Sequence, residues 1–419
     1  MTNDTPAPRW LGIIADDYTG ATDVAGKLVR EGVSTLQYFG VPHQPAPPRQ
    51  HECLVVALKS RSLEPAEAVA LSLDAARWLL AQGVRTLFFK YCSTFDSTAR
   101  GNIGPVADAL ADLTGSPRVI VAPSVPEQGR TVYQGHLFVG GQLLNESWMR
   151  WHPLNPMTDC SVVRLLAAQS ANGVGLAPWQ VVNRGPSAVA AALDGASAQG
   201  RRLVVADAVT DADLETLGSA VVDDRLVTGA AGLAVGLARA RSPRSAEGRV
   251  RLEMPAGPAV VLAGSCSQAT RRQVSNYSAA HPAFRLAAAG ESASQEAARA
   301  ADFALAHRDQ APLVYSTAEP DELAKVQNEL GAARAAATVE KAFAVIAKRL
   351  VEQGFRRIVV AGGETSGAVV DGIGVRAVEI GPELDPGVPW TVTVEDRPIA
   401  LLLKSGNFGG PDIFERALR

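Results

Sequence analysis

The sequence predicts an α/β protein of two domains, each a mainly parallel sheet flanked by helices, with the active site in the interdomain cleft. Three observations predict the α/β class and the two domains. The chain has 419 residues. This length exceeds that of one typical domain with a single hydrophobic core, since domains average about 150 residues. Apolar runs bounded by turn residues alternate with Ala/Leu-rich helical stretches, which is typical of parallel sheets covered on both faces. That alternation stops at residues 242–257 and then restarts.

The interruption, "SPRSAEGRVRLEMPAG", replaces the apolar pattern with Pro, Gly, Ser and alternating charges. Such composition is typical of a linker between domains. The expected organisation is therefore a first domain of residues 1–241, a linker of residues 242–257 and a second domain of residues 258–419.

Short apolar runs between turn residues predict the strands of the first domain. They lie at residues 10–15, 33–39, 53–59, 86–90, 118–123, 202–208 and 225–229. A helix is expected to open at Thr19-Gly20 and to end at Gly32. A longer helix between the third and fourth strands carries apolar Ala68, Leu71, Ala75 and Leu79 on one face. In such sheets ligands bind beyond the carboxyl ends of the strands, where the polar clusters of this chain fall.

The second domain repeats the same alternation. Its strands are expected at residues 258–265, 284–290, 312–318, 357–361, 376–381 and 399–404, with a helix from about Gln268. An Ala-rich stretch, residues 330–349, predicts a surface helix.

Composition excludes several classes of protein. The net charge of −3 and an aromatic content of 5% offer neither a basic stripe nor a base-stacking platform, so we expect no nucleic-acid partner. No apolar run is long enough to span a membrane, and "MTNDTPAPRW" lacks the pattern of a secretory signal. The four cysteines form no C-x-x-C pair, which favours a reducing compartment. A cytoplasmic enzyme is expected, with its oligomeric state open and a homo-oligomer included.

The first chemical motif is "IIADDYTGATD". It places Asp16 and Asp17 at the carboxyl end of a strand, where paired carboxylates orient hydroxyls, take a proton or hold Mg²⁺. The alternative is that Asp17 or Thr19 merely caps the helix. The segment is not a phosphate-binding P-loop, because Lys27 is followed by Leu rather than by Ser or Thr.

The next two motifs follow neighbouring strands. In "KSRS", Ser60 and Arg61 come at a strand end, where an arginine can bind a carboxylate through two parallel bonds. An exposed surface arginine is an equal alternative. "KYCSTFDSTARGNIGP" carries more ionisable and hydroxyl groups than a turn requires. Its candidate substrate-binding residues are Lys90, Asp96, Ser97, Arg100, Gly101 and Asn102. Lysine, arginine and the following helix start would attract an anion, although a polar loop with one cap is the alternative.

A loop-rich segment follows, "PEQGRTVYQGHLFVGG" and "ESWMRWHPLNPMTD". It contains Arg130, His136, Glu146, His152 and Asp159, and loops of this length are usually binding elements. His136 is the candidate substrate ligand among them, although a lone histidine is more often structural. With 6 histidines and no close spacing, a histidine metal site is not expected, and metal ligands are not assigned.

Glycine-rich turns follow three strands of the second domain, in "VVLAGSCSQAT", "VVAGGETSGAVV" and "LLLKSGNFGG". Glycines let backbone N–H groups approach phosphates, so these turns predict a nucleotide site. Its candidate residues are Ser265, Gly362, Gly363, Glu364, Thr365 and Gly406. A partial dinucleotide fingerprint at Gly372 is discounted, because the strand-like "VEIG" follows where a helix is required.

Taken together, "ADDYTGATD", "KSR", "DSTARGN", "GSCSQAT", "AGGETSG" and "KSGNFG" resemble the four-carbon acid sugar kinase family. The motifs span nearly the whole chain. Within the family, the "CSTF" lead into "DST" and the segment "HLFVGGQLLNESWMRWHPLNPMTD" look like the 3-oxo-tetronate 4-kinase branch. The resemblance implies a substrate domain followed by a nucleotide-binding domain, with ATP and Mg²⁺ as cofactors. It also implies transfer of phosphate to the terminal 4-hydroxyl of a four-carbon keto acid.

The motifs and the family resemblance together predict that Arg61, Lys90 and Arg100 bind the substrate carboxylate. They also predict that Asp96 or Asp17 accepts the hydroxyl proton. The alternatives are a D-threonate or D-erythronate 4-kinase and, in another class, a non-catalytic sugar-acid sensor. A phosphatase or mutase with Asp16 as nucleophile is less well matched, because "DDYTG" lacks the spaced acid pair of such enzymes.

Overall fold

The computed structural model describes residues 9–47, 51–152, 155–241, 252–286, 293–318 and 331–419. Its contacts divide the chain into two compact units, Met1–Arg249 and Val250–Arg419. Residues 242–251 of the expected linker lie outside the described residues, so the domain boundaries stay a prediction.

The first unit is built on a parallel sheet with the strand order β2-β3-β1-β4-β11-β5-β10-β9. The strands are β1 (Leu11–Ala15), β2 (Thr35–Phe39), β3 (Cys53–Ala57), β4 (Thr86–Lys90), β5 (Val119–Ala122), β9 (Val174–Ala177), β10 (Leu203–Ala206) and β11 (Leu226–Gly229). The central strands β1, β3 and β4 are buried along their whole length, as expected for a sheet covered on both faces. All the strands predicted from apolar runs in this half are confirmed, and β9 is additional.

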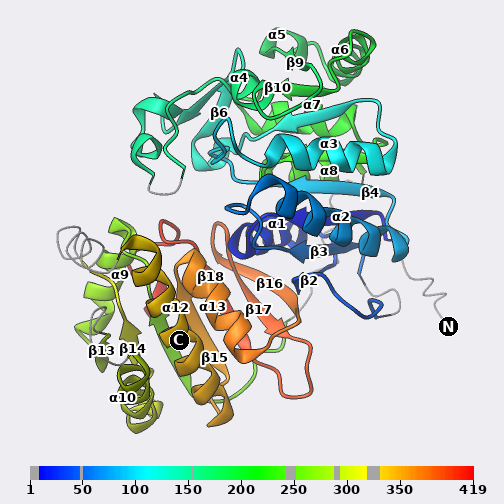
Figure 1. The fold of residues 1–419 in the computed structure, drawn as a ribbon. Helices are drawn as coiled ribbons and strands as arrows, with labels where there is room; N and C mark the ends of the chain where they lie inside the picture. The colour runs from blue at the N-terminus through cyan, green and yellow to red at the C-terminus, as the bar shows by residue number, and fades with distance from the viewer. Residues whose placement is uncertain (1–8, 48–50, 153–154, 242–251, 287–292, 319–330) are drawn as a thin grey trace, which may run out of the picture. The chain divides into compact units, whose positions relative to one another are not determined.

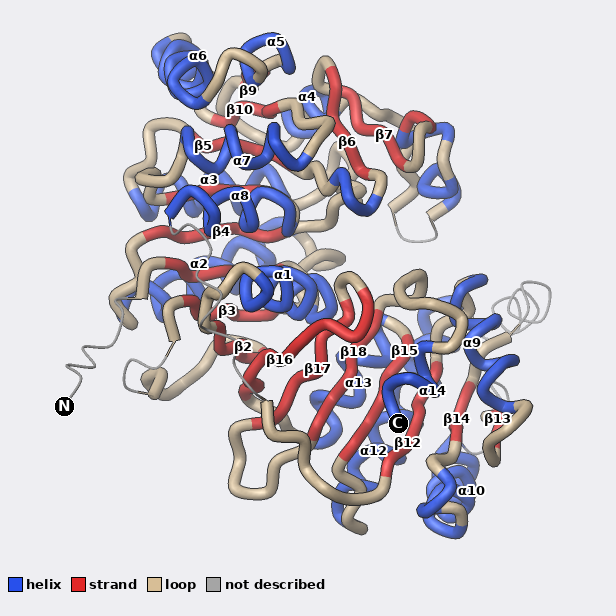
Figure 2. Tube along the Cα trace, turned by 180° about the vertical axis from the view of Figure 1, so that it is seen from behind, coloured by secondary structure: helices blue, strands red, loops and turns tan. Residues whose placement is uncertain are grey.

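Helices cover both faces of this sheet. They are α1 (Tyr18–Arg30), α2 (Pro65–Ala81), α3 (Ile103–Thr114), α4 (Val162–Ala167), α5 (Trp179–Val182), α6 (Pro186–Ala198), α7 (Asp211–Ala220) and α8 (Ala231–Arg241). Figures 1 and 2 show α2 and α3 together on one face and α1, α7 and α8 on the other. The predicted helices are confirmed, with α1 beginning directly after Asp17.

The segment expected to be loop-rich contains a small antiparallel sheet. Its strands are β6 (Arg130–Tyr133), β7 (His136–Val139) and β8 (Gln142–Leu143). Short 3₁₀ turns, η1 (Pro126–Gln128), η2 (Leu144–Glu146) and η3 (Trp148–Trp151), flank it. The hairpin was missed because its strands are short and half exposed, so the apolar alternation that marks a strand is weak.

The second unit has a mixed sheet with the order β13-β14-β12-β15-β18-β17-β16. Its strands are β12 (Ala259–Ala263), β13 (Ala283–Arg285), β14 (Leu313–Tyr315), β15 (Arg357–Ala361), β16 (Ala377–Asp385), β17 (Val388–Thr393) and β18 (Ala400–Lys404). Pairing is parallel from β13 to β18 and antiparallel from β18 to β16. The strand β16 confirms that "VEIG" ends the partial dinucleotide fingerprint. The expected strand at 284–290 is described only to residue 286, and β17 was not predicted.

Helices again lie on both faces. They are α9 (Gln268–Ser278), α10 (Ala293–Ala306), α12 (Ala332–Glu352), α13 (Gly363–Ile373) and α14 (Ile413–Leu418), with the 3₁₀ turn η4 (Arg308–Gln310). Figures 1 and 2 show α12 and α13 on one face and α9 and α14 on the other. The core on the α9 side joins Val274 and Tyr277 to Phe414 and to strand residues such as Val261. The Ala-rich helix is confirmed as α12.

Candidate acid and nucleotide sites

Three adjacent parallel strands end in register in the first unit. Ala15 at the end of β1 pairs with Ala57 of β3 and with Lys90 of β4. The residues that follow β1 and β3, and the last residue of β4, therefore meet at one edge of the sheet. This register brings Asp16, Arg61 and Lys90 together although 74 positions (90 − 16) separate the first from the last.

Arg61 binds both aspartates of "ADDYTG". Its Nε donates to Asp16 Oδ2 at 2.9 Å, and its Nη2 donates to Asp16 Oδ1 at 2.8 Å and to Asp17 Oδ1 at 2.6 Å. The Arg61 side chain is 25% exposed and that of Asp16 is 4% exposed. The alternative of an exposed surface arginine is therefore wrong, and Arg61 ties the end of β1 to the segment after β3.

Asp17 also caps helix α1. Its Oδ1 accepts from the Gly20 N–H at 3.1 Å, and its Oδ2 accepts from the Thr19 hydroxyl at 2.7 Å. The capping alternative thus holds for Asp17, but capping accounts for only part of its contacts. A Cβ on Gly20 would lie 2.2 Å from Asp17 Oδ1, so this cap requires glycine at the third following position.

Burial and charge act differently on the two carboxyls. Burial raises the pKa of Asp16 above its usual value despite the opposing effect of Arg61. Burial would also raise the pKa of Asp17, but Arg61, Lys90 and the hydrogen bonds from Thr19 and Gly20 outweigh it and lower that pKa. The charges of Asp16 and Asp17 raise the pKa of Arg61 well above its usual value against the effect of its burial. Asp17 and Arg61 are therefore firmly ionised.

Lys90 is a buried cation beside this cluster. It is 3% exposed, and among the described residues its ammonium makes neither a hydrogen bond nor an ion pair. The ammonium lies close to Gly20, because a Cβ added to Gly20 would be 2.8 Å from Lys90 Nζ. The nearby Asp16 and Asp17 carboxyls partly balance its charge, and an anionic ligand that accepted a hydrogen bond from the ammonium would stabilise it further.

The segment after β4 is fastened to the segment after β3. The Asn102 side-chain amide donates to the carbonyls of Ser60 at 2.8 Å, Arg61 at 3.3 Å and Leu63 at 3.0 Å. Ser60 is 3% exposed. The Asn102 amide is thus committed to holding the Arg61 segment, and the substrate-binding roles of Asn102 and Ser60 stay predictions.

Asp96 sits in a strained turn. Phe95 and Asp96 have φ values of 59° and 30°, a conformation that is uncommon for residues with side chains and is frequent at functional sites. Asn155 Nδ2 donates to Asp96 Oδ1 at 3.2 Å, and His152 Nδ1 lies 3.7 Å from the same oxygen. Of these two partners, only His152 was considered from the sequence. Asn155 carried no local signal.

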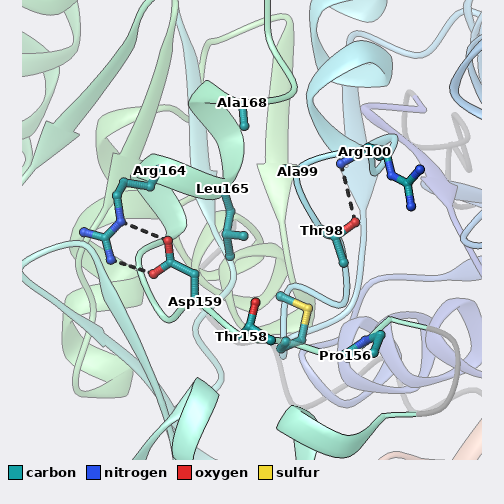
Figure 3. Close-up of a pocket in the computed structure, with 10 residues that line it drawn as sticks. Thr98, Ala99, Arg100, Pro156, Thr158, Asp159, Arg164, Leu165 and Ala168 are labelled. Carbon is teal, nitrogen blue, oxygen red and sulfur yellow. Dashed lines mark hydrogen bonds and ion pairs between the residues drawn. The ribbon is translucent and has the colours of Figure 1, made fainter.

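Other predicted residues of the same motif are spread around this turn. Ser97 Oγ accepts from Gln169 Nε2 at 3.0 Å, and the Gly101 N–H donates to the Thr98 carbonyl at 2.8 Å. Arg100 is exposed and lines a cavity of about 470 Å³. Figure 3 shows its guanidinium extending away from the Asp159–Arg164 ion pair on the other side of that cavity.

His136 is placed on the small antiparallel sheet. Its Nδ1 shares a 2.7 Å hydrogen bond with the Gln134 carbonyl, and burial raises the pKa of Asp207, which the charge of His136 would lower. Nothing in the described residues joins His136 to the Arg61 cluster. Its substrate-binding role stays a prediction.

Arg130, the first residue of β6, was noted in the sequence but not chosen as a site residue. It is half-buried, its Nη1 donates to the Gln128 carbonyl, and its buried Nε has no partner among the described residues. Burial lowers its pKa, while the nearby Cys92 and Asp23 partly oppose that effect. The charge of Lys90 also acts on Asp23, where it opposes the rise that burial causes in the pKa of that carboxyl. Arg130 therefore belongs to the surroundings of the proposed acid site.

The second unit repeats the same construction. Ala263 of β12, Ala361 of β15 and Lys404 of β18 are paired in register, and each predicted glycine turn follows one of these strands. The prediction that the three turns lie at equivalent strand ends is confirmed. Their backbones are linked directly, because the Gly362 N–H donates to the Lys404 carbonyl at 2.9 Å and the Ser265 N–H donates to the Ala361 carbonyl at 3.1 Å.

These turns approach each other so closely that side chains would not fit. A Cβ on Gly406 would lie 2.4 Å from Ser265 Oγ, and one on Gly362 would lie 3.2 Å from Ser265 N. Gly362 also has a φ of 130°, which favours glycine. It precedes α13, whose first turn presents exposed Gly363 and Glu364. The structure thus gathers Ser265, Gly362 and Gly406 into one cradle at a helix start, an arrangement that suits phosphate groups.

Thr365 and Lys404 are buried residues that contact the turns of this cradle. Thr365 is 5% exposed and lies against Gly264, where a Cβ would be 2.2 Å from Thr365 Oγ1. Lys404 is fully buried, and its ammonium donates to Thr270 Oγ1 at 3.1 Å and to the Gly406 carbonyl at 3.2 Å. Lys404 belongs to the motif "KSGNFG", but the sequence predicted no role for it. Its signal was a lysine closing an apolar strand, the same feature that marked Lys90.

Comparison with known families agrees with this division. Residues 11–237 match the family described as a sugar-binding N-terminal domain, and residues 260–414 match the one described as a nucleotide-binding C-terminal domain. A 3-oxo-tetronate kinase of Cupriavidus necator is 51% identical over 100% of this chain and 99% of its own length. The chain belongs to the four-carbon acid sugar kinase family.

Other members of the family resemble the chain along its length. A 3-oxo-tetronate kinase of Salmonella typhimurium is 44% identical and covers 98% of each chain. A crystal structure from Salmonella typhimurium LT2, described as that of a tRNA synthase, has a TM-score of 0.87 at 44% identity and covers 98% of each chain. A Haemophilus influenzae protein has a TM-score of 0.79 at 42% identity and covers 97% of this chain and 99% of its own.

The Arg61 cluster gives a stability prediction. Arg61→Met should cost about 3 kcal/mol of unfolding free energy, because it leaves the buried Asp16 and its neighbour Asp17 without their cation. Arg164→Met is the matched control, since Arg164 also binds an aspartate through two bonds but is 62% exposed, and it should cost less than about 1 kcal/mol. Urea unfolding of both variants measures the difference. Equal, small losses would contradict the structural importance given to Arg61.

Proposed function

We propose that the protein is an ATP-dependent kinase that phosphorylates the 4-hydroxyl of 3-oxo-tetronate. The observation that carries this proposal is 51% identity, over the whole chain, to a protein named 3-oxo-tetronate kinase. The geometry supports it, because one unit holds the buried Lys90 at the end of β4 and Asp96 in a strained turn after that strand, and the other gathers glycine turns at the start of a helix. Transfer across a cleft between the domains stays a prediction.

The carboxylate of the acid is proposed to bind Lys90 and Arg130. Both are buried or half-buried cations whose side chains lack an acidic hydrogen-bond partner among the described residues. Arg61 was expected to share this role, but its Nε and Nη2 are taken by Asp16 and Asp17. Arg61 therefore acts mainly as a positioning residue, with Nη1 left for the substrate. Arg100, being exposed, is assigned to the outer edge of the site.

Asp96 is the better of the two candidate bases. All hydrogen bonds that Asp17 accepts lock its carboxylate in place, and its lowered pKa makes it a weak base. Among the described residues the Asp96 carboxylate receives one hydrogen bond, from Asn155 to Oδ1, and none to Oδ2. In the proposed step the 4-hydroxyl oxygen bonds to the γ-phosphorus, the bond from that phosphorus to the β,γ-bridging oxygen breaks, and the hydroxyl proton passes to Asp96. ADP leaves with the electron pair of the broken bond.

The nucleotide is proposed to bind the cradle formed by Ser265, the Gly362–Thr365 turn and Gly406. Mg²⁺ is proposed to arrive as part of the Mg·ATP substrate. Among the described residues there is no group of three or more His, Cys, Asp or Glu side chains that could hold a metal. The Asp16–Asp17 pair does not fit Mg²⁺ well, because Arg61, Thr19 and Gly20 already occupy its oxygens. No step is therefore assigned to a protein-bound metal.

The expected cytoplasmic location stays a prediction. All four cysteines are free thiols, in keeping with the expected cytoplasmic location. No helix among the described residues is long and apolar enough to cross a membrane. Homo-oligomerisation also stays a prediction.

A substrate panel tests the proposal. A coupled ADP-release assay with Mg·ATP should show turnover with 3-oxo-tetronate that exceeds turnover with D-threonate, L-threonate and D-erythronate. Preference for a hydroxy acid would retain the kinase and replace the substrate. Acid binding without ADP release would favour the sugar-acid sensor instead.

Removal of the proposed base gives the second test. Asp96→Asn should lower kcat by about 10²-fold or more, since general base catalysis contributes at least that much. Asparagine tolerates the positive φ of this position, so the fold should survive. Asp74→Asn, at an exposed ion pair on α2, is the control and should leave kcat unchanged. Near-normal turnover by Asp96→Asn would exclude Asp96 as the base.

The anion-binding role of Arg130 gives the third test. Arg130→Met should raise KM for the acid by about tenfold to hundredfold, the usual effect of losing a charged hydrogen bond. KM for ATP should stay the same. Arg85→Met is the control, because Arg85 lies before the amino end of β4 in an exposed pair with Asp223. An unchanged KM for the acid would remove Arg130 from the site.

A further inference from the structure

Lys404 is the most unusual charged residue of the second unit. It is fully buried at the end of β18, and no acidic group pairs with it among the described residues. Within the part of the chain that the structure describes, its hydrogen bonds go to the neutral Thr270 hydroxyl and Gly406 carbonyl. A buried lysine is normally paired with a carboxylate, so this position is expensive for the folded protein.

The surroundings do not need the ammonium for their own hydrogen bonding. The Gly406 carbonyl also accepts from Ser267 Oγ at 2.6 Å and from Thr270 Oγ1 at 2.8 Å. The turn would therefore keep two donors if the charge of Lys404 were removed. A purely structural role gives no reason for a lysine here.

Lys404 instead touches the turns proposed to bind phosphate. Its ammonium contacts the Gly406 carbonyl, and its own carbonyl accepts from the Gly362 N–H at 2.9 Å. Ser265 lies against Gly406 on the other side, where a Cβ would be 2.4 Å from Ser265 Oγ. The cation is thus placed directly beneath the cradle.

The charge of Lys404 is poised to change. Burial lowers the pKa of Lys404 from 10.5 to about 7, and no other group contributes. The titratable groups on neighbouring elements are Cys266 before α9, Arg271 on α9 and Glu364 on α13, and none of them acts on Lys404. Near neutral pH the amine therefore exchanges readily between its charged and uncharged forms.

We propose that Lys404 is a phosphate-sensing cation of the nucleotide site, which takes up a proton when nucleotide phosphates occupy the cradle above it. This proposal rests on the nucleotide binding of the proposed function. The negatively charged phosphates would supply the counter-charge for the Lys404 ammonium, with which no carboxylate pairs among the described residues. Lys404 acts through the Gly406 turn, so it is a positioning residue rather than a catalytic one.

The sign of the resulting pH dependence follows from linkage. Below pH 7 Lys404 is already charged, and binding takes up no proton through it. Above pH 7 it is neutral in the free protein, so binding draws one proton from solution. Affinity should then fall by about tenfold for each pH unit until the raised pKa of the complex is reached.

Titration calorimetry with Mg·ADP tests this without turnover. At pH 8 the terminal phosphate of ADP is ionised, since its pKa is about 6. Binding measured in two buffers with different ionisation enthalpies should show uptake of about one proton. ADP binding without proton uptake would overturn the role of Lys404 and leave the kinase proposal standing. No ADP binding at all would overturn both.

Variants separate this role from a structural one. Lys404→Met should abolish the proton uptake and weaken ADP binding at pH 7 by about tenfold or more. It should also raise the thermal midpoint at pH 7, because the cost of burying the charge is fully present below the lowered pKa and disappears above 10.5. Lys348→Met removes an exposed lysine on α12 and is the control, with no effect expected on either property. A Lys404→Met protein that loses stability and retains proton uptake would contradict the proposal.

Discussion

The acid site depends on one interaction, the clamp of Arg61 on Asp16 and Asp17. The clamp joins the residues that follow two parallel strands, and Asn102 then fastens the third strand's loop to the same segment. Arg61 binds both aspartates through hydrogen bonds, and the charge of Lys90 also acts on both carboxyls, without a hydrogen bond or ion pair to them among the described residues. The sequence shows two acids and two bases there, and the hydrogen bonds of Arg61 with both aspartates leave Lys90 as the cation proposed to meet an anionic ligand.

The proposed nucleotide site uses the same principle with different residues. A lysine again closes a buried strand, and among the described residues no carboxylate pairs with Lys404. In both units the lysine is held by register with neighbouring parallel strands, so its position is as rigid as the sheet itself. A buried cation on a rigid element is preorganised, and the ligand meets little reorganisation cost on binding.

These arrangements are costly for folding and useful for binding. Lys90, Arg130 and Lys404 each lie in surroundings that disfavour an uncompensated charge. The strained turn at Phe95 and Asp96 adds a local cost of the kind that is found at functional sites. An enzyme that transfers phosphate between two anionic substrates needs such positive charge, and the remaining apolar sheet and helix packing has to hold it in place.

The sequence by itself determined the α/β class, the division into two halves and the strand ends at which the polar motifs lie. Apolar runs and turn residues are local signals, so Asp16, Arg61, Lys90 and the glycine turns could be found from them. Only the tertiary structure decided which of these groups neutralise each other. That Arg61 is occupied, that Asn155 reaches Asp96 and that the Lys404 ammonium donates to Thr270 all depend on contacts between segments far apart in the chain. Spacing along a sequence carries no such information, because strand register and burial set both the partners and the pKa of each charged group.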